Sequence, residues 1–218
     1  MLWNLVILNL VKLNKMKIIF CIPGKTFSNN FLVSWTKLVK YCDNNNIEYE
    51  LSNVDVSIVH LARYGCLMID PESQCGACLN PFQKEIDYDY IMWIDSDMVF
   101  EPAHFEKLLK AEKRVITGLA KINRTNEYAC FKKDKNERIT DEYIKNNSGI
   151  IETSFTGMSF MLIKYGVYEE MQFPYFSVPG ESGMLSETLS FCHNLSKANI
   201  PIHAHLDVII GHEKPMII

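Results

Sequence analysis

Two aspartates one residue apart, Asp95 and Asp97, directly follow a run of apolar and aromatic residues at positions 90–94. Such a β-prone run is typical of a strand buried on both faces of an α/β sheet. In an extended segment, residues i and i+2 point the same way, so the two carboxylates could converge on one cation. Carboxylates suit Mg²⁺ or Mn²⁺ with a phosphate on the other side of the ion. The alternative is a loop in which the aspartates only cap the following helix.

The segments around this pair predict alternating strands and helices. Strands are predicted over residues 17–22, 47–54, 90–94 and 114–119, and helices over about 27–42, 57–68 and from Pro102 onward. This alternation is typical of an α/β fold with a mostly parallel central sheet and helices on both faces. In such sheets ligands bind at the carboxyl ends of the strands, which is where Pro23, Gly24 and the aspartates fall.

Beyond residue 120 the pattern changes. Residues 121–147 are polar and charged, with one short β-like piece at 128–131, and are predicted to form a loop beside the site or, alternatively, an exposed insertion. Two strands around Gly157, at 150–155 and 158–163, a helix at 185–198 and a last strand at 202–210 complete the expected elements.

Length and charge limit the function classes. The 218 residues suit one domain over 16–218, with residues 1–15 as an extension outside the core or, alternatively, a weakly amphipathic membrane-surface helix. No apolar stretch reaches the roughly 20 residues that span a bilayer. The net charge of −4 offers no positive field for a nucleic acid polymer. Seven scattered cysteines are typical of a reducing compartment, so we expect a cytoplasmic protein.

Four segments carry chemistry in a recognisable order. They read IIFCIP at 18–23, IDSDM at 94–98, FTGMSFMLI at 155–163 with FPYF at 173–176, and SETLSFC at 186–192 with GH at 211–212. In this order they resemble the first strand and donor loop, the D-x-D motif, the central strand and the acidic helix with terminal histidine of GT-A fold glycosyltransferases. The likeness is greatest to small family-2-like enzymes of viruses and bacteria, and it covers most of residues 17–213.

The resemblance implies a metal site. Asp95, Asp97 and His212 would hold Mn²⁺ or Mg²⁺ bridging the diphosphate of a nucleotide-sugar donor, with a UDP-sugar favoured and nitrogen ligation favouring Mn²⁺. Without the resemblance, an ordinary surface histidine would be the favoured interpretation of His212.

The resemblance also implies a donor pocket and a general base. Pro23, Arg63, Asp95 and Ser96 would bind the donor, although Arg63 could instead belong to a solvated helix face. Glu187 would take the proton from the hydroxyl of a glycan, lipid or protein acceptor in an inverting hexosyl transfer.

Thr188 departs from this pattern, because similar enzymes carry aspartate there. The base and the stereochemical outcome therefore stay open, and a catalytically degenerate module that binds sugar or a partner is an alternative. A nucleotidyltransferase is a second alternative, but residues 23–26 are too short for its Gly-rich triphosphate loop.

Overall fold

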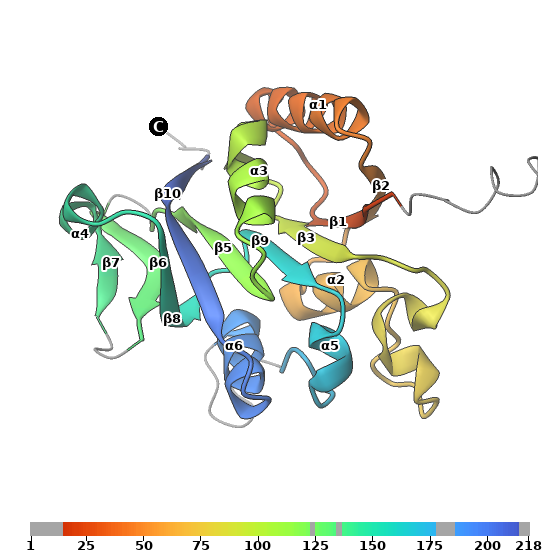
Figure 1. Cartoon of the computed structure of the whole chain (residues 1–218). Coiled ribbons are helices and arrows are strands. Elements are labelled where there is room, and N and C mark those ends of the chain that lie inside the picture. The colour runs from red at the N-terminus through yellow and green to blue at the C-terminus, as the bar shows by residue number, and fades with distance from the viewer. Residues whose placement is uncertain (1–14, 123–124, 134–136, 178–185, 214–218) are drawn as a thin grey trace, which may run out of the picture.

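The computed structural model describes residues 15–122, 125–133, 137–177 and 186–213. All but the last residue of the predicted extension 1–15 lies outside these ranges, so the division into extension and domain stays a prediction. The described residues form one mixed sheet with helices packed on both faces (Figure 1). The predicted α/β class is therefore confirmed.

The strands are β1 (Lys17–Pro23), β2 (Glu48–Val54), β3 (Tyr90–Ile94), β4 (Met98–Val99), β5 (Val115–Ala120), β6 (Glu127–Lys132), β7 (Arg138–Thr140), β8 (Ile150–Thr156), β9 (Phe160–Lys164) and β10 (Ile202–His212). The helices are α1 (Asn29–Asn44), α2 (Val59–Cys66), α3 (Pro102–Lys110), α4 (Asp141–Asn146), α5 (Val167–Glu170) and α6 (Glu187–Lys197), with two short 3₁₀ turns at Ala77–Leu79 and Pro81–Lys84. The sequence predicted most of these elements but neither the 3₁₀ turns nor β4, β7, α4 and α5.

The strands follow the order β2-β1-β3-β9-β5-β10-β8-β6-β7, with β4 paired to β10. Strands β1, β2 and β3 are parallel, β5 and β10 are parallel, and β9 lies antiparallel between the two groups. Tracing the pairings places β1, β2, β3, β5, β6 and β10 in one direction and β7, β8 and β9 in the other. The sheet is thus mixed: most of its strands run in one direction, but antiparallel pairings outnumber the parallel ones of the mostly parallel sheet that was predicted. The carboxyl ends of β1, β3, β5 and β10 meet at one edge of the sheet.

Strands β8 and β9 show how the chain places its antiparallel members. They run in the same direction, and only residues 157–159 separate them. Strand β8 pairs with β10 and β6, whereas β9 pairs with β3 and β5. The short connection therefore carries the chain from one part of the sheet to another, directly beside the strand ends.

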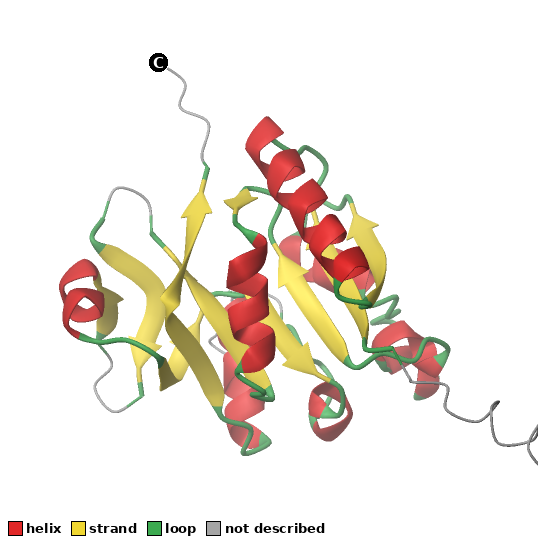
Figure 2. Cartoon of the chain, turned by 45° about the horizontal axis from the view of Figure 1, so that its top comes forward, coloured by secondary structure: helices red, strands yellow, loops and turns green. Residues whose placement is uncertain are grey.

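Two apolar layers cover the faces of the sheet. Helices α1 and α3 lie over one face, and α2, α5 and α6 lie over the other (Figure 2). The fully buried side chains of Met92 and Trp93, which are neighbours on β3, belong to opposite layers, as successive residues of a strand covered on both faces do. Within the described ranges, no helix is both long and apolar enough to cross a membrane.

The described residues of the polar segment 121–147 include two strands and a helix, which corrects the expectation of a loop beside the site or an exposed insertion. Strands β6 and β7 extend the sheet and, with α4, cover an apolar cluster that includes Tyr128, Cys130 and Ile139. Alternate residues of β6 point inward, so few apolar residues suffice to bury one face. The sequence showed the β-like piece at 128–131, but the charged residues around it hid the rest of this unit.

Candidate active site

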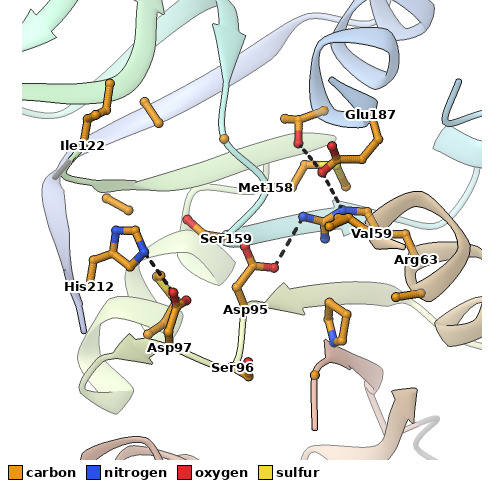
Figure 3. Close-up of a pocket in the computed structure, with 18 of the residues that line it drawn as sticks. Val59, Arg63, Asp95, Ser96, Asp97, Ile122, Met158, Ser159, Glu187 and His212 are labelled. Carbon is orange, nitrogen blue, oxygen red and sulfur yellow. Dashed lines mark hydrogen bonds and ion pairs between the residues drawn. The ribbon is translucent and has the colours of Figure 1, made fainter. Parts of the chain in front are cut away.

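A cavity of about 670 Å³ opens at the carboxyl ends of the parallel strands (Figure 3). Its lining includes every candidate residue that the sequence suggested: Pro23, Arg63, Asp95, Ser96, Asp97, Glu187 and His212. These residues come from β1, α2, the β3–β4 turn, α6 and β10. The fold thus brings together side chains separated by up to 189 positions of sequence, which is the distance from Pro23 to His212.

The two aspartates lie in a tight turn between β3 and β4. The N–H of Met98 donates to the carbonyl oxygen of Asp95 at 3.2 Å, and the N–H of Asp95 donates to the carbonyl oxygen of Ser159 at 2.9 Å. The sequence analysis assumed an extended segment, but the chain turns here. The two carboxylates therefore do not point the same way. The alternative of helix capping is also wrong, because Glu101 occupies the N-cap of α3.

His212 lies beside Asp97 at the end of β10. Its Nε2 is 3.0 Å from Oδ2 of Asp97, and its Nδ1 is 3.1 Å from the carbonyl oxygen of Lys121. Because a carbonyl oxygen only accepts, Nδ1 carries the proton and Nε2 faces the carboxylate. That arrangement is favourable when a cation, either a proton or a metal ion, lies between Nε2 and Asp97. Metal-binding histidines commonly donate their other N–H to a carbonyl in this way.

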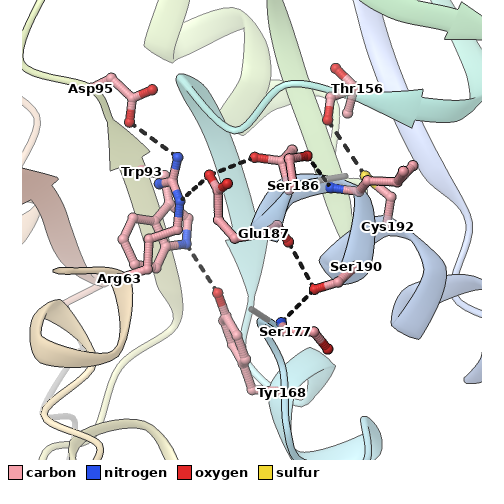
Figure 4. A network of polar contacts seen from close by, with 12 residues as sticks. Arg63, Trp93, Asp95, Thr156, Tyr168, Ser177, Ser186, Glu187, Ser190 and Cys192 are labelled. Atoms are coloured by element: carbon pink, nitrogen blue, oxygen red, sulfur yellow. Dashed lines mark hydrogen bonds and ion pairs between the residues drawn. The ribbon is translucent and has the colours of Figure 1, made fainter. Parts of the chain in front are cut away.

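Arg63 connects two carboxylates from different elements (Figure 4). Its side chain is only 4% exposed, and its Nη2 lies 3.4 Å from Oδ1 of Asp95 while its Nε lies 3.4 Å from Oε1 of Glu187. The guanidinium also stacks over the ring of Trp93, 5.2 Å from its centroid. Its Nη1 is buried and has no hydrogen-bond partner among the described residues. Arg63 is therefore not on a solvated helix face.

The charges of the cavity perturb one another. Burial raises the pKa of Asp95, the Arg63 guanidinium opposes this, and the negative charges of Asp97 and Glu187 add to it. Burial would lower the pKa of Arg63, but the charges of Asp95 and Glu187 outweigh it and the pKa rises. Lys121 also lines the cavity, but its Nζ pairs with Asp141 at 2.7 Å. Carboxylates thus outnumber the cations that face them, which favours binding of a further cation.

Glu187 is the first residue of α6 and is held by its neighbours. The hydroxyl of Thr188 donates to its Oε1 at 2.9 Å, and the side chain of the N-cap residue Ser186 accepts from the N–H of Leu189 at 3.1 Å. The Ser190 hydroxyl donates to the Glu187 carbonyl oxygen and accepts from the N–H of Ser177 (Figure 4). Thr188 thus supports the Glu187 carboxylate, a role that the sequence analysis missed.

Gly24 brings the loop after β1 against the aspartate turn. Its φ is +146°, and a Cβ built on it would lie 2.5 Å from Oγ of Ser96. Its N–H donates to the carbonyl oxygen of Val54 at 3.0 Å, which fixes the loop to β2. Only glycine fits this approach. The sequence placed Pro23 and Gly24 at the carboxyl end of a strand, but it could not show the contact of Gly24 with Ser96.

The chain was compared with known proteins by sequence and by structure. No protein-family model and no curated protein sequence matches the chain. Among solved structures, protein A197 from STIV aligns with a TM-score of 0.52 at 18% identity, over 93% of this chain and 96% of that chain. The catalytic domain of Drosophila β1,4-galactosyltransferase 7, in complex with xylobiose, aligns with a TM-score of 0.50 at 11% identity, over 92% of this chain and 71% of that chain.

At these identities the likeness shows the fold alone. The architecture is that of the GT-A-like glycosyltransferases, as the sequence predicted. The narrower resemblance to small family-2-like enzymes stays a prediction, and so does the role of each residue in the cavity.

Proposed function

We propose that this protein is a metal-dependent glycosyltransferase that moves a sugar from a nucleotide-sugar donor, a UDP-sugar, to a hydroxyl of a glycan, lipid or protein acceptor. The observation that carries the proposal is that Asp95, Asp97 and His212 line one cavity at the carboxyl ends of the strands of a GT-A-like sheet. Ligands of such sheets bind at this edge.

A divalent cation fits the donor set of this cavity. Asp95, Asp97 and Nε2 of His212 would hold Mn²⁺ or Mg²⁺, since oxygen and imidazole ligands suit these ions. A diphosphate would not enter a cavity with excess carboxylates unless a cation compensated its charge. When bound, the ion neutralises the charge that develops on the departing nucleoside diphosphate.

The donor lies, on this proposal, against Pro23, Gly24 and Ser96, where the loop after β1 meets the aspartate turn. The backbone at this contact approaches closely because Gly24 has no side chain. The guanidinium of Arg63 lines the same cavity.

Glu187 acts as the general base. The acceptor oxygen attacks the anomeric carbon, its proton passes to the Glu187 carboxylate, and the bond to the diphosphate oxygen breaks with its electron pair leaving on the nucleoside diphosphate. Direct displacement of this kind inverts the configuration at the anomeric carbon. Arg63 Nε and the Thr188 hydroxyl both contact Oε1 of Glu187 and hold the carboxylate in place.

Calorimetry and thermal unfolding with UDP, GDP, CMP and dTDP, with and without Mn²⁺, test the proposal on wild type and on Asp97→Ala. We expect UDP to bind only with Mn²⁺, and Asp97→Ala to lose that dependence. If none of the four nucleotides binds under either condition, the proposed donor site is wrong.

Thr188 motivates a second candidate, a degenerate fold that binds a sugar without transferring it. Metal-dependent UDP binding with no turnover across a panel of acceptors would support that candidate. Release of pyrophosphate instead of a nucleoside diphosphate would identify a nucleotidyltransferase. The predicted cytoplasmic location is a separate matter and stays a prediction.

A further inference from the structure

The carboxylates of the two aspartates face different partners. Asp95 turns toward Arg63 on α2, whereas Asp97 turns toward His212 on β10 (Figure 3). Among the described residues, no three His, Cys, Asp or Glu side chains are already gathered closely enough to hold a metal ion. The ion pair of Asp95 with Arg63 therefore occupies one of the carboxylates that the proposed metal would need.

The guanidinium of Arg63 is fixed in its position. It stacks on Trp93, which is fully buried and whose Nε1–H donates to the hydroxyl of Tyr168 at 3.0 Å. Tyr168 is itself fully buried in the apolar layer beneath. Asp95, by contrast, ends a strand and is 32% exposed. If the ion pair between Asp95 and Arg63 breaks, the Asp95 carboxylate can turn, whereas the guanidinium stays in place.

We propose that Arg63 competes with the divalent cation for Asp95. Metal binding then leaves Glu187 as the partner of the guanidinium. Arg63 thereby couples metal occupancy to the position of the base. This inference rests on the proposed function. Arg63 is on this view a positioning residue and does not contact the reacting atoms.

The contact distances support a shared guanidinium. Both contacts of Arg63, to Asp95 and to Glu187, measure 3.4 Å, which is longer than the roughly 2.7–2.9 Å of an optimal charge-assisted hydrogen bond. A cation bound at Asp95 would draw that carboxylate away and repel the guanidinium. The guanidinium would then keep Glu187 as its anionic partner, and the side chain of Glu187 is only 14% exposed. Low exposure strengthens such charge interactions.

Mn²⁺ titration calorimetry on wild type, Arg63→Gln and Glu187→Gln tests the competition without measuring turnover. Arg63→Gln should bind Mn²⁺ more tightly by about fivefold or more, the lower end of typical coupling between sites. Glu187→Gln should bind it more weakly, because Arg63 then has only Asp95 as an anionic partner. Weaker or unchanged Mn²⁺ binding in Arg63→Gln overturns the inference.

The double variant separates coupling through Arg63 from direct attraction between Glu187 and the ion. If Arg63 carries the coupling, Glu187→Gln should have almost no effect on Mn²⁺ affinity in the Arg63→Gln background. An undiminished effect would contradict the inference. Arg114→Gln is the matched control, because Arg114 pairs with Glu170 at 2.8 Å outside the cavity and should leave Mn²⁺ affinity unchanged.

A second measurement covers the case in which Arg63→Gln does not fold. Diamagnetic Mg²⁺ added to wild type should shift the ¹⁵Nε signal of Arg63 and leave that of Arg114 in place. An unshifted Arg63 signal at saturating Mg²⁺ contradicts the inference alone. If wild type binds neither ion, with or without UDP, both the inference and the proposed metal site are wrong.

Discussion

The backbone N–H of Glu213 donates a hydrogen bond to the carbonyl oxygen of Asp97 at 2.9 Å. The end of β10 is thereby tied to the aspartate turn, next to the pairing of His212 with Met98. The carboxylate of Glu213 reaches further and accepts hydrogen bonds from Ser28, the N-cap of α1, and from Asn30. The contacts of the neighbouring Glu213 with the aspartate turn and with the start of α1 therefore keep His212 beside Asp97.

These contacts of Glu213 predict that Glu213→Ala weakens metal binding. Without its carboxylate the end of β10 loses its contact with α1, and His212 is less firmly placed beside Asp97. We expect Mn²⁺ affinity to fall about tenfold, as for other residues that orient metal ligands, with the fold retained. Calorimetry measures the affinity and circular dichroism the fold. Glu152→Ala, which removes an exposed pair with Lys133, is the control, and equal losses in both variants would refute the role of Glu213.

Gly24→Ala should disrupt the donor loop. A methyl group at this position would overlap Oγ and Cβ of Ser96 and would also force a residue with a side chain into φ +146°. We expect a loss of about 1–3 kcal/mol in stability from the backbone alone and a further loss of UDP binding from the overlap.

Two further variants separate these effects. Gly149 also has a positive φ, +79°, but open space around its Cβ position, so Gly149→Ala reports backbone strain without a clash. Adding Ser96→Gly to Gly24→Ala removes both overlapping atoms and should restore part of the UDP binding. No difference between the single and double Gly24 variants would show that the contact with Ser96 is unimportant.

The helices and strands that place the site were accessible from the sequence because their signals are local. The apolar run before Asp95 predicted β3, and the helix predicted over about 27–42 corresponds to α1. The seven site residues meet because strands that run in one direction end at one edge. That rule needs only the direction of the strands and not their contacts.

The remaining features depend on contacts that no local pattern reports. Ser28 and Glu213 are 185 positions apart, and Arg63 and Glu187 are 124 apart. The pairing of β6 with β7 was hidden because β7 is only three residues long. The turn after Asp95 was misjudged as extended because the hydrogen bonds that shape it, from Met98 to Asp95 and from Asp95 to Ser159, leave no mark in the local sequence.

Glu187→Gln should slow transfer strongly while UDP still binds at saturating Mn²⁺. The amide cannot accept the proton of the acceptor hydroxyl, and the rate should fall by about 10²–10⁴-fold. Thr188→Val keeps the carboxylate but removes the hydroxyl that donates to it, so we expect a much smaller loss. Release of UDP from a UDP-sugar in the presence of acceptor measures both rates. A Glu187→Gln protein with wild-type turnover would exclude Glu187 as the base.

Acid should loosen the β6–β7–α4 unit before the rest of the sheet. Hydrogen bonds from Lys121 and from the Tyr128 hydroxyl lower the pKa of Asp141 below its ordinary value. Because the folded state then binds fewer protons than the unfolded chain, this contribution is fully present above the unfolded pKa of about 3.9 and is lost as the pH falls through the folded value. Hydrogen exchange should show β6 amides losing protection in that window while β3 amides keep theirs. Asp141→Asn should remove this pH dependence, and an unchanged acid transition in that variant would contradict the assignment to Asp141.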